Sequence, residues 1–202
     1  MHNSTKKYIS KRNKNTTTYL TINKIFEYEV NIHGVVDLYK YNLLLKINCE
    51  NNKITHIINI CQIVKYINCK NNLISEFEYL PDDLETLLCD DNKLSNLDDL
   101  PSGLKFLSCD NNKIVRLENL PLGLEYLSCG TNPIVNLDFL PAGLTKLFLN
   151  GTMDNLKSLN DLPLSIEYLI CTESLEKISK NNFPKGLILD NSLLGIWKKI
   201  KT

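Results

Sequence analysis

The sequence predicts a solenoid of the α/β class. Each repeat would contribute one short parallel β-strand to a concave sheet, and the convex side would consist mostly of turns and extended chain with little helix. Cysteines recur every 20 residues, at Cys49, Cys69, Cys89, Cys109 and Cys129. The stretch from Leu100 to Asn119 is followed directly by a second copy of the same sequence repeat, from Leu120 to Phe139. A fixed period of about 20–50 residues is typical of stacked arrays.

Alternation inside each repeat predicts the strand. Leu107 and Cys109 would point into the core, whereas Phe106, Ser108 and Asp110 would face the other way, because successive side chains of a strand alternate between its two faces. Strands of successive repeats would pair in parallel about 4.8 Å apart. Each coil then buries its leucines only against its neighbours.

The repeat follows the pattern L-x-x-L-x-C-x-x-N-x-I/L-x-x-L. One instance consists of Leu84, Leu87, Cys89, Asn92, Leu94 and Leu97. This pattern resembles the leucine-rich repeat, and about seven copies in register, the last ones degenerate, fill residues 41–191. The short period and the Leu-Pro opening resemble the subtype found in secreted bacterial effectors and in proteins of amoeba-infecting giant viruses. The resemblance implies a scaffold for protein interaction.

An asparagine recurs three residues after each cysteine of the column, at Asn52, Asn72, Asn92, Asn112 and Asn132. A side-chain amide at this point can bind backbone groups of the turn and of the adjacent coil, where the strand's own hydrogen bonds end. We therefore predict a structural ladder and no catalytic role for these residues.

Proline and glycine close each coil in the regular repeats. Pro101 and Gly103, and their counterparts Pro121 and Gly123, are expected at the favoured positions of a type I turn. With so few residues between strands, and with proline present, the convex side is expected to be extended or turn-like.

The ends of the array are predicted to be capped. Residues 1–17 are polar and form a disordered tail, and residues 18–40 form a β-hairpin whose second strand shows alternation from Phe26 to Ile32. Residues 192–202 close the last coil with Leu193, Leu194, Ile196 and Trp197. Such caps hide the terminal leucines from water.

The cysteine column has three interpretations. Neighbouring cysteines would have Cα atoms within the range of about 4.4–6.8 Å that a disulfide allows, but their side chains run parallel into the core. A zinc or iron–sulfur site needs ligands that converge, which a straight row does not provide. Cysteine as a small buried hydrophobe is the favoured interpretation, because Leu149 continues the register. No metal or cofactor is expected.

Composition narrows the function classes. Lys and Arg together number 23 and Asp and Glu also number 23, so the chain lacks the basic charge expected of a nucleic-acid binder. No signal peptide or transmembrane run is visible, which predicts no membrane association. Seven cysteines without a signal peptide favour a reducing compartment. We expect a cytoplasmic monomer, located in the host cytoplasm if the protein is viral or an effector.

Enzymatic activity is not expected. Cys61 and His56 lie close in sequence, but no orienting carboxylate or oxyanion loop accompanies them. The effectors that the repeat resembles often carry a ubiquitin-ligase domain after the repeats, and only about thirty residues follow Cys171 here, too few for one. The alternative function is an adaptor that recruits a ubiquitination or signalling complex through its terminal segments.

The outward strand positions form the predicted partner surface for an unidentified protein or peptide. Aromatic residues are frequent there, at Tyr66, Phe106, Tyr126, Phe148 and Tyr168. Carboxylates run beside them, chiefly Asp90 and Asp110. Exposed rings in a row often mark contact sites, but rings on adjacent strands also stack to stabilise a sheet. Both interpretations stay open from the sequence alone.

Overall fold

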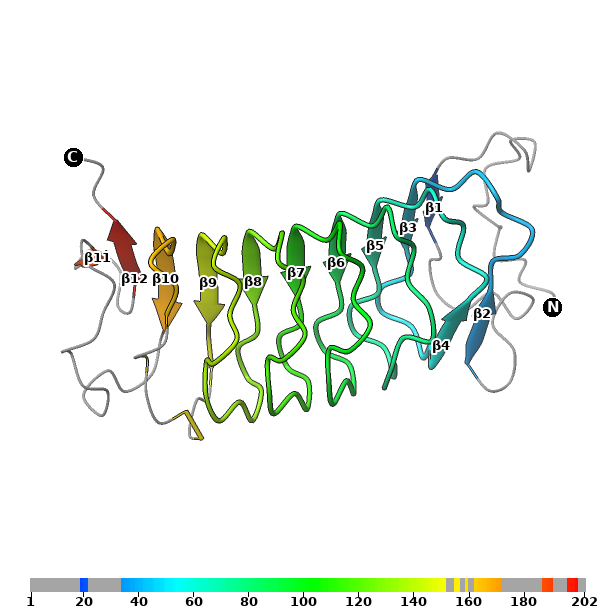
Figure 1. Cartoon of the computed structure of the whole chain (residues 1–202). Coiled ribbons are helices and arrows are strands. Elements are labelled where there is room, and N and C mark those ends of the chain that lie inside the picture. The colour runs from blue at the N-terminus through cyan, green and yellow to red at the C-terminus, as the bar shows by residue number, and fades with distance from the viewer. Residues whose placement is uncertain are drawn as a thin grey trace.

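The computed structural model describes residues 19–21, 34–151, 155–156, 159, 162–171, 187–190 and 196–199. Within them the chain winds as a solenoid, and the strands of its main sheet lie side by side in one row (Figure 1). The strands are β1 (Tyr19–Thr21), β2 (Val35–Asp37), β3 (Lys46–Asn48), β4 (His56–Ile58), β5 (Tyr66–Asn68), β6 (Thr86–Leu88), β7 (Phe106–Ser108), β8 (Tyr126–Ser128), β9 (Lys146–Leu149), β10 (Tyr168–Cys171), β11 (Leu187–Asp190) and β12 (Ile196–Lys199).

The main sheet has ten strands in the order β1-β3-β5-β6-β7-β8-β9-β10-β12-β11. Pairing is parallel from β1 through β10. The described residues contain no helix, so the rest of each coil is turn and extended chain. The predicted solenoid, with one short parallel strand per repeat and little helix, is confirmed.

The core is built from the same positions of each coil. Leu104, Leu107, Cys109 and Ile114 are completely buried, and their counterparts one repeat on are buried as well. Phe106 points to the other side of the strand and is only partly buried. The pairing Leu107 to Leu127 and its equivalents keep like residues in contact along the stack. Each buried leucine adds about 1.5–3 kcal/mol of hydrophobic stabilisation.

Asparagine and aspartate also occupy left-handed backbone positions that the repeat pattern did not predict. The residue two after each cysteine has φ between 50° and 59° at Asn51, Asn71, Asp91, Asn111 and Thr131. A second left-handed position holds Asn59, Asp99, Asn119 and Phe139, with φ between 56° and 69°. Asn and Asp tolerate this conformation better than other residues with a side chain, which explains why they recur. Thr131 and Phe139 are exceptions whose bulk makes the conformation costly.

The predicted position of proline in the closing turn is wrong. The Leu104 N–H donates to the Pro101 carbonyl at 3.1 Å, so Pro101 is the first residue of the turn and not the second. Proline supplies the accepting carbonyl there, and its missing N–H is not needed. A Cβ on Gly103 would lie 3.0 Å from the Asp82 carbonyl oxygen, so a small residue suits this close approach between coils.

A second, two-stranded sheet lies on the convex side at the N-terminal end of the array. β2 and β4 pair in parallel there, with Val36 opposite Ile57 (Figure 1). This sheet was not predicted from the sequence. The signal was present in the β-branched run at Ile57 and Ile58, where later repeats have residues such as Leu97 and Asp98, because β-branched residues favour strands.

The two ends of the main sheet differ from each other in the direction of strand pairing. β1 pairs in parallel with β3, and at the other end β12 pairs antiparallel with both β10 and β11. Parallel stacking therefore ends at β10. The second strand of the predicted hairpin, Phe26 to Ile32, and the predicted tail at 1–17 lie outside the described residues, so both stay predictions.

No helix within the described part of the chain has the length and apolar character needed to cross a bilayer.

The asparagine ladder joins each coil to the one before it. Asn112 Nδ2 donates to the carbonyls of Cys89 at 3.0 Å, Cys109 at 3.0 Å and Asp110 at 3.2 Å. Its Oδ1 accepts from the Leu94 N–H at 3.0 Å. One buried amide thus satisfies backbone groups of two coils. The same contacts are made by Asn72, Asn92 and Asn132.

Replacing Asn112 with alanine is expected to lower the free energy of unfolding by about 1–3 kcal/mol, because buried backbone groups lose their partners. Urea or thermal unfolding measures the change. Lys113→Ala is the matched control, since the Lys113 side chain is exposed, and it should unfold like wild type. An Asn112→Ala protein as stable as the control would contradict the structural role.

Candidate functional site

Four aromatic rings form a continuous row on the concave face, by which we mean the face of the ten-stranded sheet opposite the core. Phe106 and Tyr126 stack with ring centroids 3.8 Å apart and planes 9° from parallel. Tyr126 and Phe148 follow at 4.8 Å and 30°, and Phe148 and Tyr168 at 5.7 Å and 40°. We call these four residues, from strands β7 to β10, the ring row.

The ring row changes column at Phe148. The strand register places Lys146 between Tyr126 and Tyr168 and places Phe148 next to Ser128. Phe148 nevertheless bridges the two tyrosine rings, because diagonal neighbours on one sheet face lie within reach of aromatic side chains. Lys146 is exposed. All four rings are only partly buried, so the row keeps surface in contact with solvent.

Tyr66 lies outside the ring row. Its neighbour on the next strand is Thr86, which carries no ring to continue the stack. The Lys46 ammonium lies 5.8 Å from the centre of the Tyr66 ring, within cation–π range. The structure therefore brings together four of the five predicted aromatic residues and separates the fifth.

A polar column runs beside the rings at the position that follows each cysteine. It consists of Glu50, Lys70, Asp90, Asp110 and Gly130, with Asn150 at the equivalent position after Leu149, and we call it the charged column. Asp90 Oδ1 accepts the Ser108 hydroxyl at 2.6 Å and the Asp110 N–H at 2.8 Å. Asp90 Oδ2 lies 2.5 Å from the Lys70 ammonium. The Asp90 side chain is 9% exposed and is neutralised by this pair.

Asp110 repeats the same geometry without the cation. Its Oδ1 accepts the Ser128 hydroxyl at 2.8 Å and the Gly130 N–H at 2.6 Å, and its Oδ2 shares the same hydroxyl at 2.7 Å. Lys70 lies one coil before Asp90. The residue one coil before Asp110 is Asp90 itself, which is an acid and not a cation. Among the salt bridges that the described residues form, none includes Asp110.

Burial raises the pKa of the Asp110 carboxyl above its usual range, and the Asp90 charge raises it further, against the hydrogen bonds from Ser128 and Gly130. Burial also raises the pKa of Tyr126, and the Asp110 charge adds to that shift. The carboxylate therefore acts on the neighbouring ring. The Lys70 charge lowers the pKa of Asp110 as well, but burial outweighs it, so the charged form of this half-buried carboxylate costs free energy.

The concave face is less open than the sequence suggested. Ser108 and Ser128 were expected to face away from the core, and they do, but they are only 6% and 4% exposed. Their hydroxyls are taken up by Asp90 and Asp110. Outward-facing residues are covered here because long neighbouring side chains pack over short ones. The ring row and the larger members of the charged column are thus among the accessible parts of this face.

The cysteine column behaves as part of the core. Burial raises the pKa of the Cys49 thiol to about 12 and raises the pKa of the thiols that follow it along the stack. The thiols of Cys69, Cys89 and Cys109 point at carbonyls of the next strand, at 3.3–3.4 Å. Thiols held this way stay protonated near neutral pH and are poor nucleophiles. Within the described residues, no group of three or more metal-binding side chains comes together.

The Cys61 and His56 side chains have separate partners. The Cys61 thiol donates to the Asn42 carbonyl at 2.7 Å, and His56 Nδ1 lies 3.1 Å from the Thr55 hydroxyl. Neither contact activates a nucleophile.

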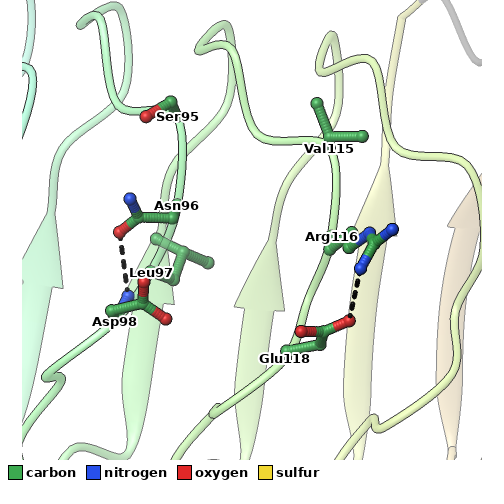
Figure 2. Close-up of a pocket in the computed structure, with 7 residues that line it drawn as sticks. All are labelled: Ser95, Asn96, Leu97, Asp98, Val115, Arg116 and Glu118. Carbon is green, nitrogen blue, oxygen red and sulfur yellow. Dashed lines mark hydrogen bonds and ion pairs between the residues drawn. The ribbon is translucent and has the colours of Figure 1, made fainter.

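A shallow depression lies on the convex side between two adjacent coils (Figure 2). Arg116 pairs with Glu118 at 3.3 Å there, and the Asp98 N–H donates to Asn96 Oδ1 at 3.2 Å (Figure 2). Both members of the ion pair are largely exposed, and exposed pairs contribute little. The depression is therefore a weaker candidate for a binding site than the concave face.

No protein-family profile matches the chain. No curated protein sequence matches it either.

Solved structures do match. YopM from Yersinia enterocolitica WA-314 is 26% identical with a TM-score of 0.52, over 66% of this chain and 36% of that chain. A functional domain of InlJ from Listeria monocytogenes, which includes a cysteine ladder, is 26% identical with a TM-score of 0.56, over 67% and 31% of the two chains. YopM from Yersinia pestis, a leucine-rich effector protein, is 21% identical with a TM-score of 0.57, over 84% and 59%.

These similarities define the class of the protein as a leucine-rich-repeat solenoid, and the resemblance predicted from the sequence is confirmed. The protein is similar in fold to YopM and to the InlJ domain. The chain spans about a third of the length of the first two structures it matches, with 36% and 31% of them covered.

Thiol labelling tests the buried column. Native protein treated with DTNB at mildly alkaline pH is expected to react rapidly at Cys61 alone, because the other six cysteines are buried. All seven should react after unfolding. Cys61→Ser is the control and should remove the rapid phase. Rapid labelling of two or more thiols in the native protein would contradict the structure.

The raised pKa of Asp110 predicts a pH-dependent stability difference. The folded protein holds a proton at Asp110 more tightly than the unfolded chain does. This contribution is complete below the unfolded pKa of about 3.9 and is lost as pH rises through the higher folded pKa. Asp110→Asn should therefore gain stability relative to wild type between about pH 3 and pH 7, as measured by thermal unfolding. A relative loss over that interval would refute the assignment.

Proposed function

We propose that the protein is a non-enzymatic scaffold that binds a protein or peptide on the concave face of its sheet. The observation that carries the proposal is the ring row formed by Phe106, Tyr126, Phe148 and Tyr168 across four successive strands. Leucine-rich-repeat solenoids present an extended concave surface suited to binding. The partner we propose has apolar anchors for the rings and basic residues for the carboxylates Asp90 and Asp110.

Stacking alone does not account for the ring row. Cross-strand pairs stabilise a sheet by about 0.2–1 kcal/mol each, and the close Phe106–Tyr126 stack fits that role. Phe148, however, extends the row from a different column and keeps it continuous past Lys146. Partly exposed aromatic residues in one line are the side chains that most often dominate protein interfaces. The row therefore supports binding in addition to stabilisation.

We base the proposed cellular location of the partner on the repeat subtype. The short Leu-Pro repeats resemble those of bacterial effectors and giant-virus proteins, so we propose that the partner is a protein of the cytoplasm, and of the host cytoplasm if the chain is an effector or viral. The protein would act there as a monomer. The balance of 23 basic and 23 acidic residues supports a protein partner over a nucleic acid.

Replacing Phe106 and Tyr126 together with serine tests the proposed surface. Affinity purification from the native cytosol with wild-type protein as bait should recover a partner, and the double variant should recover at least about tenfold less, because central aromatic residues carry about 2 kcal/mol or more at interfaces. Thermal unfolding shows that the variant is folded.

Leu122→Ser is the matched control. Leu122 is 87% exposed on a turn away from the concave face, and its replacement should leave recovery unchanged. Undiminished recovery by the folded double variant would refute concave-face binding. Loss with Leu122→Ser in place of the double variant would move the site to the turn. Ubiquitin-ligase subunits recovered independently of the rings would favour an adaptor acting through the terminal segments.

A further inference from the structure

One member of the charged column differs from its neighbours in how its charge is compensated. Asp90 and Asp110 occupy equivalent positions on adjacent coils, and each accepts a serine hydroxyl and a backbone N–H from the next coil. Asp90 also has the Lys70 ammonium on its second oxygen at 2.5 Å. Within the described residues, the second oxygen of Asp110 shares the Ser128 hydroxyl and forms no salt bridge, so the Lys70 charge acts on Asp110 without direct contact.

The Asp110 side chain is partly exposed. The next position of the charged column is Gly130, where a Cβ would collide with the backbone of Asn150, so the fold excludes any side chain there. No lysine or arginine of this chain follows in the column. A carboxylate oxygen can accept more than one hydrogen bond, and Oδ2 of Asp110 therefore has capacity for a donor from outside.

The ring row and this carboxylate share strand β8: Ser128, whose hydroxyl Asp110 accepts, lies two residues after Tyr126 and therefore on the same face of the strand. The Asp110 charge acts on Tyr126, which is the second ring of the row and stacks on Phe106. A guanidinium group can bind a carboxylate through its planar edge and lie against an aromatic face at the same time. The protein shows both halves of this arrangement with its own lysines, Lys70 on Asp90 and Lys46 near Tyr66.

We propose that Asp110 determines specificity on the concave face by binding a basic side chain of the partner, which lies against the Tyr126 ring. This inference rests on the proposed function and names the chemistry that the partner must carry. The partner segment has one arginine or lysine next to apolar residues that cover the rest of the ring row. Its cation takes the place on Asp110 that Lys70 takes on Asp90.

A peptide-display selection tests the inference while the natural partner is still unidentified. Random peptides are selected on immobilised full-length wild-type protein, and each binder is then tested on the Phe106→Ser/Tyr126→Ser variant. Binders that need the two rings are expected to share an arginine or lysine flanked by apolar residues. The tightest such peptide is the probe for the next measurement.

Dissociation constants are then measured for that peptide and for a version with its basic residue changed to glutamine, on wild type and on Asp110→Asn. Each single change should weaken binding about tenfold, as expected for a hydrogen bond to a charged group. The two changes together should weaken it little further, because each removes the same contact. Asp91→Asn is the matched control for charge. Asp91 follows Asp90 in the preceding coil and is exposed, so its replacement should change binding by about twofold or less.

The outcomes separate the two proposals. Ring-dependent peptides that lack a shared basic residue, or that bind Asp110→Asn as tightly as wild type, would overturn the inference and leave concave-face binding intact. The comparison of the basic and glutamine peptides on wild-type protein decides the matter even if Asp110→Asn does not fold, since no loss of affinity there also overturns the inference. Recovery of no ring-dependent peptide would count against both.

Discussion

The structure depends on the contact between one coil and the next being the same at every step. Buried leucine and cysteine side chains fix the spacing, and the ladder amides of Asn72, Asn92, Asn112 and Asn132 each join carbonyls of two coils, while Asn52 binds the Cys49 and Glu50 carbonyls of its own coil. A coil has no core of its own, so it is stable only if its neighbour presents matching groups at matching places. An error in register between two coils would leave buried backbone groups without partners at that junction.

Because the inward positions are constrained in this way, the outward positions can vary without altering the fold. Lys70, Asp90, Asp110 and Gly130 occupy one column with almost the same backbone, yet their chemistry passes from cation to carboxylate to no side chain. The same holds for the rings, which begin at Phe106 and continue to Tyr168. Function on such a scaffold is therefore encoded in columns of outward residues, and the repeat itself supplies only their spacing.

Periodicity made the fold predictable. The constant cysteine spacing and the inward pair of Leu107 and Cys109 were enough to place the strands of the regular repeats. The convex strands β2 and β4 were missed because they occur only where the pattern is irregular. Proline was placed one position too late in its turn, since composition does not say which residue donates the closing hydrogen bond. The diagonal step of Phe148 into the ring row depends on side-chain packing between strands, which spacing along the chain does not encode.

Asp90 and Asp110 differ in how their charges are compensated. Asp90 has the Lys70 ammonium on its second oxygen, whereas none of the salt bridges among the described residues includes Asp110. Burial raises the pKa of Asp110, so the charged form is less favourable in the folded protein than in water. A cation from a partner would remove that penalty on binding, because an opposite charge stabilises the ionised carboxylate. In the proposed complex, a basic partner would therefore offset the free-energy cost of keeping Asp110 charged in the folded protein.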